Sequence, residues 1–332
     1  MAGSVAVAVL TVANLAGCTG QAIVEAATNI MESDLPFVSV CIPVYNDTAR
    51  LKMLLELLEA QTYPSDRFEV IVCDNASTQP VEPALVNAPH ARIVRETRVG
   101  PDHARNAGIL ASKAQYLAFT DSDTTPYPNW LENGVRALLR HPNCGLVGGP
   151  VHLYPVDPNR TTLTEKLEMT TAFNTKANVL QHHFMPTCNL FTHRAVLDKV
   201  GLFDGDLLGS SGDEEWGQRV HAAGYELIYD PEVALRHPAR HSFAELKRKT
   251  RRIAFGYVGL LKHRSPKPLL LQWPYLRRLW LLPMPVDVRT AFRNNKYALS
   301  DQFKLFGILY WGRVYRAWVL VTALFPTKGR LW

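Results

Sequence analysis

Between residues 37 and 120 the sequence alternates short apolar runs with segments of helical periodicity. The apolar runs cover residues 37–44, 68–73, 91–94 and 116–120, and the helical segments cover residues 51–61 and 102–113. Strands that alternate with helices at this spacing form a mostly parallel sheet with helices on both faces. The sequence therefore predicts an α/β fold with a Rossmann-like half. The turn after the first run, Pro43-Val44-Tyr45-Asn46, lacks the G-x-G-x-x-G pattern, which disfavours a dinucleotide site.

Two carboxylates follow the fourth apolar run, in the sequence Asp121-Ser122-Asp123. In open α/β sheets, ligands bind beyond the carboxyl ends of the strands. Carboxylates one residue apart can share a hard divalent cation, whose other ligands are normally waters and substrate phosphates. The motif therefore indicates a site for a metal-bound diphosphate, although a solvated turn has the same spacing.

Charge is divided unevenly along the chain. Residues 1–238 contain 17 Lys and Arg against 27 Asp and Glu, a balance of −10, whereas residues 239–332 contain 19 against 3, a balance of +16. An asymmetry of this size indicates an anionic partner for the C-terminal region, either a membrane surface or a nucleic acid. No RNA-binding motif accompanies the arginines, so we expect no nucleic-acid partner.

The C-terminal region, residues 241–332, also contains apolar segments. They cover residues 253–261, 269–273, 276–282 and 303–325. The last of them is long enough to span a bilayer, but Arg313 and Arg316 lie in its middle, each at a cost of about 2.5–3.5 kcal/mol near the bilayer centre. We therefore predict basic, amphipathic helices that lie on an anionic membrane surface. A helical lid over the catalytic part is the alternative.

The N-terminal segment, residues 1–34, is predicted to be an extension outside the fold. Its residues 15–18 match the cleavage pattern of a bacterial lipoprotein, but no Lys or Arg precedes Arg50. A secretory signal needs a positively charged n-region. We therefore expect a chain that starts at Met31 to fold and to act normally.

Further motifs occur in a fixed order along the chain. They are Pro43-x-Tyr45-Asn46, Cys73-Asp74-Asn75-Ala76-Ser77, Ala104-Arg105-Asn106, Asp121-Ser122-Asp123, Thr187-Cys188-Asn189, Gly212-Asp213-Glu214-Glu215-Trp216 and His237-Pro238. From about Phe37 to Arg240 the chain resembles family 2 glycosyltransferases of the GT-A fold. It looks most like bacterial enzymes that build surface or extracellular polysaccharide. The resemblance implies a GT-A domain over residues 35–240, with a nucleotide-binding half (35–125) and an acceptor half (126–240).

The resemblance also implies a nucleotide-sugar site at the first strands. Pro43, Tyr45 and Asn46 would shape the pocket for base and ribose, and Asp74 would accept a hydrogen bond from the nucleobase. Arg105 would face the nucleotide together with a helix N-terminus. Ordinary turns are the alternative for the first four residues, and a surface salt bridge is the alternative for Arg105.

For the metal, the resemblance implies that Asp123 ligates Mn²⁺ or Mg²⁺. Asp121 would bind the ribose or a metal-bound water, and His237 would be the third ligand. An imidazole packed beside a proline is the alternative for His237.

Asp213 is the predicted general base of this site. In the family an acidic residue at the start of a helix deprotonates the acceptor hydroxyl, and a single displacement inverts the sugar. The common pattern places Glu before this Asp, whereas here the residue is Gly212, which leaves Glu214 as the other candidate. Trp216 and Arg219 fix the register in favour of Asp213.

Three residues are expected to contact the acceptor. Glu215 would hold acceptor or backbone groups, Trp216 would offer an apolar face to a sugar ring, and Asn189 belongs to the same group. A buried core indole is the alternative use of Trp216.

The functional prediction is a metal-dependent inverting glycosyltransferase at the cytoplasmic face of the cell membrane. It would move a sugar from a nucleotide-diphosphate sugar to a hydroxyl of a glycan or lipid-linked acceptor in polysaccharide biosynthesis. A sugar nucleotidylyltransferase is the alternative among enzymes, but it needs a Gly-rich, basic first turn, which residues 43–46 do not provide. A catalytically inactive membrane scaffold is the other alternative, and the presence of Asp123 and Asp213 argues against it.

Overall fold

The computed structural model describes residues 35–207, 211–281, 284–292 and 297–324. The predictions for residues 1–34, for the start at Met31 and for the end of the apolar segment 303–325 lie outside these residues. The description below concerns the compact unit that begins at Phe37.

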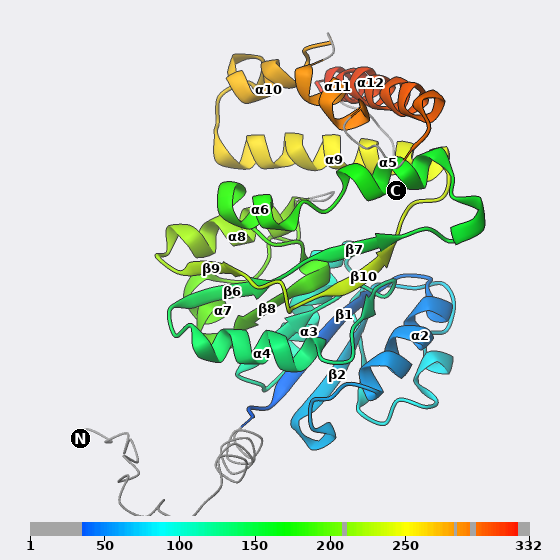
Figure 1. The fold of residues 1–332 in the computed structure, drawn as a ribbon. Helices are drawn as coiled ribbons and strands as arrows, with labels where there is room; N and C mark the ends of the chain where they lie inside the picture. The colour runs from blue at the N-terminus through cyan, green and yellow to red at the C-terminus, as the bar shows by residue number, and fades with distance from the viewer. Residues whose placement is uncertain (1–34, 208–210, 282–283, 293–296, 325–332) are drawn as a thin grey trace, which may run out of the picture. The chain divides into compact units, whose positions relative to one another are not determined.

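A seven-stranded sheet forms the centre of the fold, with the strand order β3-β2-β1-β4-β8-β6-β9 (Figure 1). Its strands are β1 (Val38–Val44), β2 (Phe68–Asp74), β3 (Ala91–Arg95), β4 (Tyr116–Phe119), β6 (Cys144–Gly148), β8 (Leu190–His193) and β9 (Glu226–Tyr229). All neighbours pair in parallel except β8, which is antiparallel to both β4 and β6. The prediction of a mostly parallel sheet is therefore confirmed.

Helices cover the sheet. They are α2 (Thr48–Glu59), α3 (Pro101–Ala111), α4 (Trp130–Arg140), α5 (Leu163–Thr171), α6 (Thr175–His182), α7 (Arg194–Val200) and α8 (Gly212–Ala222). Helix α2 buries Leu51, Leu54, Leu55 and Leu58, whose spacing places them on one face. Helix α3 begins with Pro101, because the missing N–H and fixed φ of proline suit the first helical position.

A second, three-stranded sheet has the order β5-β10-β7. Its strands are β5 (Thr125–Pro126), β7 (Val151–Tyr154) and β10 (Leu235–Pro238). Strand β5 begins two residues after Asp123, and β10, which contains His237, pairs with it in antiparallel register. This small sheet therefore brings a histidine from late in the domain to the Asp121–Asp123 motif.

Helices α5 and α6 are separated by three residues. The chain turns between them because Ala172 has extended backbone angles and Phe173 is left-handed, with φ at 53°. The turn places the Phe173 ring 5.2 Å from the His237 ring, centroid to centroid. The turn between α5 and α6 therefore lies beside His237.

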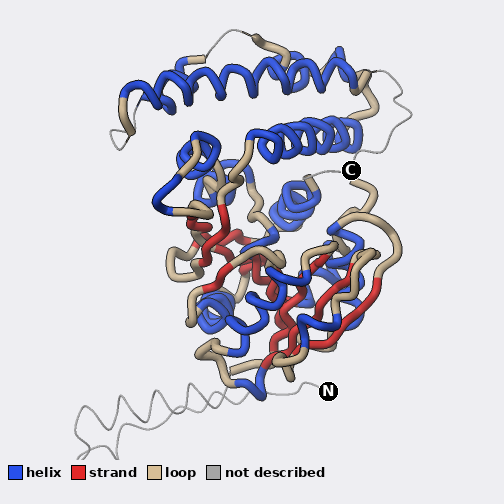
Figure 2. Tube along the Cα trace, turned by 90° about the vertical axis from the view of Figure 1, so that its right-hand side faces the viewer, coloured by secondary structure: helices blue, strands red, loops and turns tan. Residues whose placement is uncertain are grey.

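Four helices follow the catalytic domain: α9 (Phe243–Arg264), α10 (Trp273–Arg278), α11 (Pro285–Phe292) and α12 (Leu299–Thr322). Both ribbon views place α9 beside the catalytic domain and α10 to α12 on its far side (Figures 1 and 2). These helices share a core of their own, formed by Ala254, Val258, Leu261, Leu269, Tyr275, Val319 and Leu320. Among the described helices, none combines the length and apolarity needed to cross a bilayer.

Candidate functional site

The carboxyl ends of β1, β2 and β4 meet at one edge of the sheet, as their parallel pairing requires. Asn46 follows β1, Asp74 ends β2, and Asp121 and Asp123 follow β4. The motifs predicted to bind the donor are therefore brought to one edge of the fold.

The first two of these residues hold the loop after β2. Asp74 is buried; its Oδ1 accepts from the backbone N–H of Ser77 at 3.0 Å, and its Oδ2 pairs with Arg95 at 2.9 Å. Asn46 is left-handed, with φ at 51°, and its Oδ1 accepts from the backbone N–H of Thr78 at 2.8 Å. These contacts are those of the turn alternative. Each oxygen of the Asp74 carboxylate still has a second lone pair that can accept a hydrogen bond from a ligand.

Pro43 and Tyr45 lie at the same edge. Pro43 is half-buried, whereas the side chain of Tyr45 is 59% exposed. The Tyr45 ring is therefore open to a ligand at this edge.

Arg105 is buried between two carboxylates. Its Nη1 donates to Asp102 and its Nη2 donates to Asp121, each at 2.8 Å. Burial alone would lower the pKa of the guanidinium, but the two carboxylates outweigh it and raise the pKa above its usual value. The surface salt bridge considered from the sequence is therefore replaced by a buried network, which fixes the orientation of Asp121.

Asp102 is a residue of this network that the sequence motifs did not single out. It is 7% exposed, and its Oδ2 lies 1.9 Å from the position that a Cβ on Gly212 would take. A side chain at position 212 is excluded while Asp102 stays in place. The sequence signal for Asp102 was Gly212, which departs from the family pattern. A glycine at this position leaves room for a carboxylate from another helix, α3.

Asp213 is the second residue of α8 and is half-buried. Burial and, after it, the neighbouring Asp102 raise the pKa of Asp213 while Arg105 lowers it, and the resulting pKa is about 7. A carboxylate whose pKa lies near neutrality can take up a proton during the reaction. Its neighbour Glu214 is already engaged, since its Oε1 accepts from Gln218 at 3.4 Å and from Arg264 at 3.1 Å.

Asp123 and His237 form the part of the site that suits a cation. The Oδ1 atom of Asp123 lies 3.4 Å from Nε2 of His237. The Nδ1 of His237 lies 2.8 Å from the carbonyl oxygen of Pro238, which can only accept, so Nδ1 is the protonated nitrogen. Nε2 is the ring nitrogen on the side of Asp123, and metal-ligating histidines are oriented by the same kind of N–H bond from their other nitrogen to a carbonyl.

Asp121 does not complete a triad with these two residues. Its Oδ1 is turned to Arg105, and within the described ranges no group of three His, Cys, Asp or Glu side chains is gathered as a metal site. An oxygen and an imidazole nitrogen nevertheless fit Mn²⁺ or Mg²⁺, since such ions keep waters and substrate phosphates among their ligands.

Comparison with known proteins places these motifs in a family. The sequence profile described as "Glycosyl transferase family 2" matches residues 39–201. Glycosyltransferase AglE of Haloferax volcanii is 36% identical over 233 residues, which cover 69% of this chain and 75% of that protein. The chain belongs to glycosyltransferase family 2. An uncharacterized glycosyltransferase of Rickettsia typhi is 25% identical over 81% of this chain and 84% of its own.

The fold of the glycosyltransferase is shared with a solved structure, the mannosyltransferase PcManGT from Pyrobaculum calidifontis in complex with GDP-Man and Mn²⁺. The two align with a TM-score of 0.57 and 18% identity over 91% of this chain and 94% of the other. The predicted GT-A fold is thereby confirmed.

The residues expected to contact the acceptor of the glycosyltransferase have internal partners instead. Trp216 is fully buried and donates through Nε1 to the Gly201 carbonyl at 2.9 Å, which is the core role considered as its alternative. Asn189 is also fully buried and accepts from Trp130 Nε1 at 2.8 Å. Glu215 is 6% exposed and pairs with Arg219 at 2.5 Å. These contacts are internal to the protein, and the acceptor role of the three residues stays a prediction.

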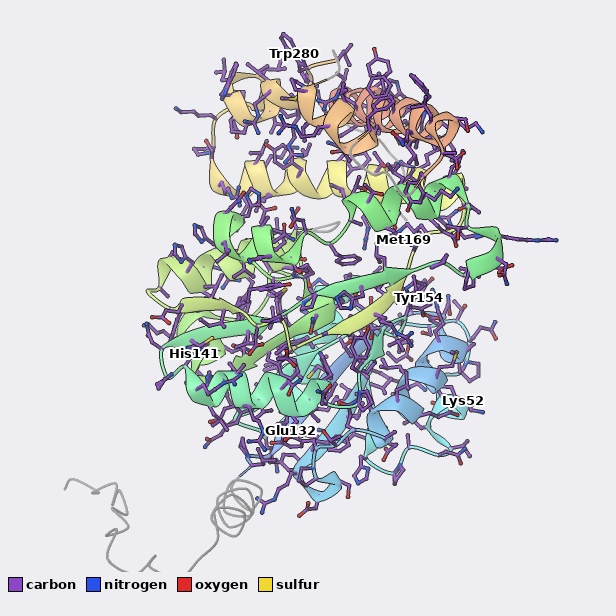
Figure 3. All side chains as sticks on the ribbon, viewed as in Figure 1. Lys52, Glu132, His141, Tyr154, Met169 and Trp280 are labelled. Carbon is purple, nitrogen blue, oxygen red and sulfur yellow. The ribbon has the colours of Figure 1, made fainter. Side chains whose placement is uncertain are left out.

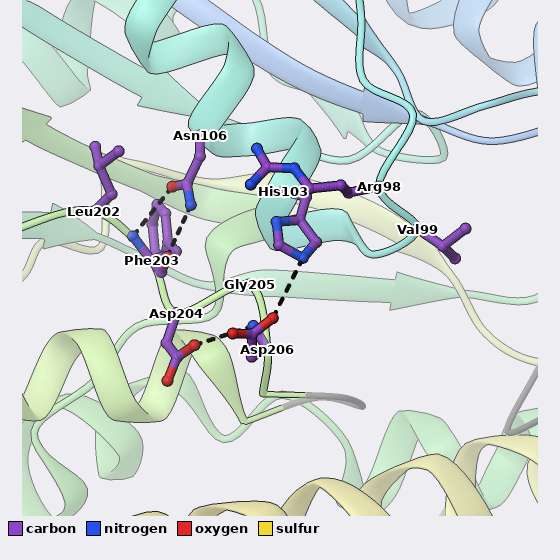
Figure 4. Close-up of a pocket in the computed structure, with 9 residues that line it drawn as sticks. All are labelled: Arg98, Val99, His103, Asn106, Leu202, Phe203, Asp204, Gly205 and Asp206. Carbon is purple, nitrogen blue, oxygen red and sulfur yellow. Dashed lines mark hydrogen bonds and ion pairs between the residues drawn. The ribbon is translucent and has the colours of Figure 1, made fainter.

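A cavity of about 730 Å³ lies between the start of α3 and the loop after α7 (Figure 4). His103 and Asp206 face each other across it at 3.9 Å, and Asn106 exchanges hydrogen bonds with the backbone of Phe203. Neither aspartate of the Asp121–Asp123 motif lines it. The cavity is therefore separate from the Asp121–Asp123 motif.

Proposed function

We propose that this glycosyltransferase moves a sugar from a nucleotide-diphosphate sugar to a hydroxyl group with inversion at the anomeric carbon. The observation that carries the proposal is Asp213, a half-buried carboxylate with a pKa near 7 beside the end of β4 and α3. Asp213 would remove the proton of the acceptor hydroxyl as that oxygen attacks the anomeric carbon. The bond to the diphosphate breaks on the opposite face, so one displacement gives one inversion. Such proton removal is typically worth about 10²–10⁴ in rate.

The donor site would be the edge formed by Tyr45, Asn46, Asp74 and the Asp121–Asp123 motif. Arg105 holds Asp121 in a fixed orientation, and Asp123 with His237 would hold Mn²⁺ or Mg²⁺. A bound divalent cation neutralises charge that develops on a departing diphosphate. The complex of the mannosyltransferase PcManGT with GDP-Man and Mn²⁺ supports this assignment, because the two chains share a fold.

A donor-hydrolysis assay tests the function. Purified protein is incubated with Mn²⁺ and a panel of UDP-, GDP- and dTDP-sugars, and we expect one nucleotide class to be hydrolysed at a measurable rate. NMR of the released sugar early in the reaction would show the anomer opposite to that of the donor. Release of pyrophosphate from a nucleoside triphosphate and a sugar phosphate would instead identify a nucleotidylyltransferase. Absence of all turnover would favour an inactive scaffold.

We further propose that the enzyme works at the cytoplasmic face of the cell membrane, on a glycan or lipid-linked acceptor in polysaccharide biosynthesis. The C-terminal helices support this through large apolar side chains that remain exposed, among them Leu271 (72%), Trp273 (71%), Trp280 (55%) and Trp318 (59%). Trp280 lies at the outer surface of these helices (Figure 3). Indole rings next to a balance of +16 over residues 239–332 are typical of a helix that lies in the interface of an anionic bilayer.

Binding to vesicles tests the membrane proposal. We expect the protein to sediment with phosphatidylserine vesicles and to be released as salt rises, because each basic residue near the surface contributes about 1 kcal/mol that ions screen. Trp273→Ala should weaken binding, whereas Leu110→Ala is a matched control, since Leu110 is equally exposed (72%) on α3 of the catalytic domain. A protein that only detergent extracts, or whose C-terminus is cleaved by protease from the far side of sealed vesicles, would contradict interfacial binding.

A further inference from the structure

Helix α9 presents different residues on two opposite faces. Ala254, Val258 and Leu261 are buried in the core shared with the later helices. Lys249, Arg252, Gly256, Gly259 and His263 follow one another at intervals of three or four residues and so form a second stripe. Residues two positions apart on an α-helix, such as Arg252 and Ala254, are rotated by roughly 200° about its axis, so the second stripe faces away from the first.

The second stripe lies against the catalytic domain. Lys249 pairs with the buried Glu168 of α5 at 2.6 Å. About four turns further along, His263 Nδ1 lies 3.5 Å from the carboxylate of Asp204, and a Cβ on Gly259 would lie 3.8 Å from Leu207. Contacts at both ends therefore fix this face of α9 over the catalytic domain, and Arg252 lies between them.

Arg252 is a cation of this face that has no ion pair among the described residues. Its side chain is exposed, although the protein atoms around it and the neighbouring Arg240 lower the pKa of its guanidinium. The charges of Asp121 and Asp213 oppose this shift, which places Arg252 within electrostatic reach of both carboxylates of the site.

Other arginines near the site are already neutralised. Arg105 is held by Asp102 and Asp121, and Arg240 pairs with Glu168 at 2.9 Å. In the part of the chain that the structure describes, no carboxylate pairs with Arg252. Because Arg252 is exposed, its guanidinium is open to an anionic ligand, which would supply the missing partner.

We propose that Arg252 is a ligand-binding residue that reaches from α9 to a phosphate group in the catalytic site. A guanidinium presents a planar pair of N–H donors that matches phosphate oxygens, and it stays charged even where burial disfavours charge. The phosphate belongs either to the diphosphate of the donor or to a phosphorylated lipid acceptor. This inference rests on the proposed function, and it gives α9 a part in substrate binding besides its packing against the later helices.

Titration calorimetry with nucleoside diphosphates tests the proposal. The full-length protein in Mn²⁺ is titrated with UDP, GDP and dTDP, and the wild type is expected to bind one of them. Arg252→Ala should weaken that binding by at least about 10-fold, because a hydrogen bond to a charged group is lost. Arg252→Lys keeps a cation and should recover part of the affinity. Arg251→Ala is the matched control, since Arg251 lies on another face of α9, over the Phe255 ring.

The outcomes separate the sources of the phosphate. Weaker diphosphate binding by Arg252→Ala assigns Arg252 to the donor, and unchanged binding with a raised KM for a lipid-phosphate acceptor assigns it to the acceptor. If Arg252→Ala matches Arg251→Ala in both measurements while the wild type binds a nucleoside diphosphate, the proposal is overturned. If the wild type binds none, the proposed function itself fails. Thermal melting of each variant shows that loss of binding is not loss of folding.

Discussion

Asp213→Asn is expected to lower kcat by at least about 100-fold while the affinity for the nucleotide donor changes little. The amide keeps the shape of the side chain and removes its ability to accept a proton. Steady-state kinetics with the donor identified in the hydrolysis panel would measure kcat, and calorimetry with the nucleoside diphosphate would measure binding. Glu214→Gln is the matched control, because it makes the same change one residue further along α8 and should have a small effect.

The pH dependence of the wild type provides a second measurement of the same residue. Because burial raises the pKa of Asp213 to about 7, a larger fraction of the base is protonated, and therefore idle, below neutrality. The value of kcat/KM should thus rise with pH through an apparent pKa near 7 and then level off. Loss of activity in Glu214→Gln but not in Asp213→Asn would move the base by one residue.

Removal of the divalent cation is expected to abolish donor turnover. Asp123 Oδ1 and His237 Nε2 lie 3.4 Å apart, so an oxygen and a ring nitrogen are placed where both could ligate one cation. EDTA should stop hydrolysis of the donor, and added Mn²⁺ or Mg²⁺ should restore it. Asp123→Ala should show the same loss without chelator.

Ser122→Ala is the control for this experiment. It leaves both aspartates of the motif and removes only a hydroxyl that donates to Asp47 at 2.9 Å. It should keep its response to metal. Full activity of Asp123→Ala in metal-free buffer would show that the site needs no cation.

The sequence predicted those parts of the fold that depend on local pattern. The run of residues 37–44 is apolar except for Ser39 because β1 is covered on both faces, and β1 begins within one residue of the predicted start. The order of the motifs placed Asp74, Asp121 and Asp123 at strand ends, since the carboxyl ends of parallel strands share one edge.

The parts of the fold and site that the sequence did not predict depend on contacts between distant segments. Strands β7 and β8 have four residues each and mixed polarity, too little for a periodic signal. Trp216 could serve a sugar or the core, and only the packing of α8 on the sheet decides between them. Asp102 packs against Gly212 from another helix, and Arg252 lies within electrostatic reach of both Asp121 and Asp213, and no local spacing records either neighbourhood.

The close packing of Asp102 on Gly212 constrains how this site can change over evolution. A Cβ at position 212 would overlap the Asp102 carboxylate, so the first mutation there must push Asp102 away from Arg105. A smaller residue at position 102 instead opens the space first, and an acidic side chain at 212 can then fill it. Positions 102 and 212 together leave room for one carboxylate. That carboxylate can pass from α3 to α8 only if position 102 becomes smaller before position 212 gains a side chain.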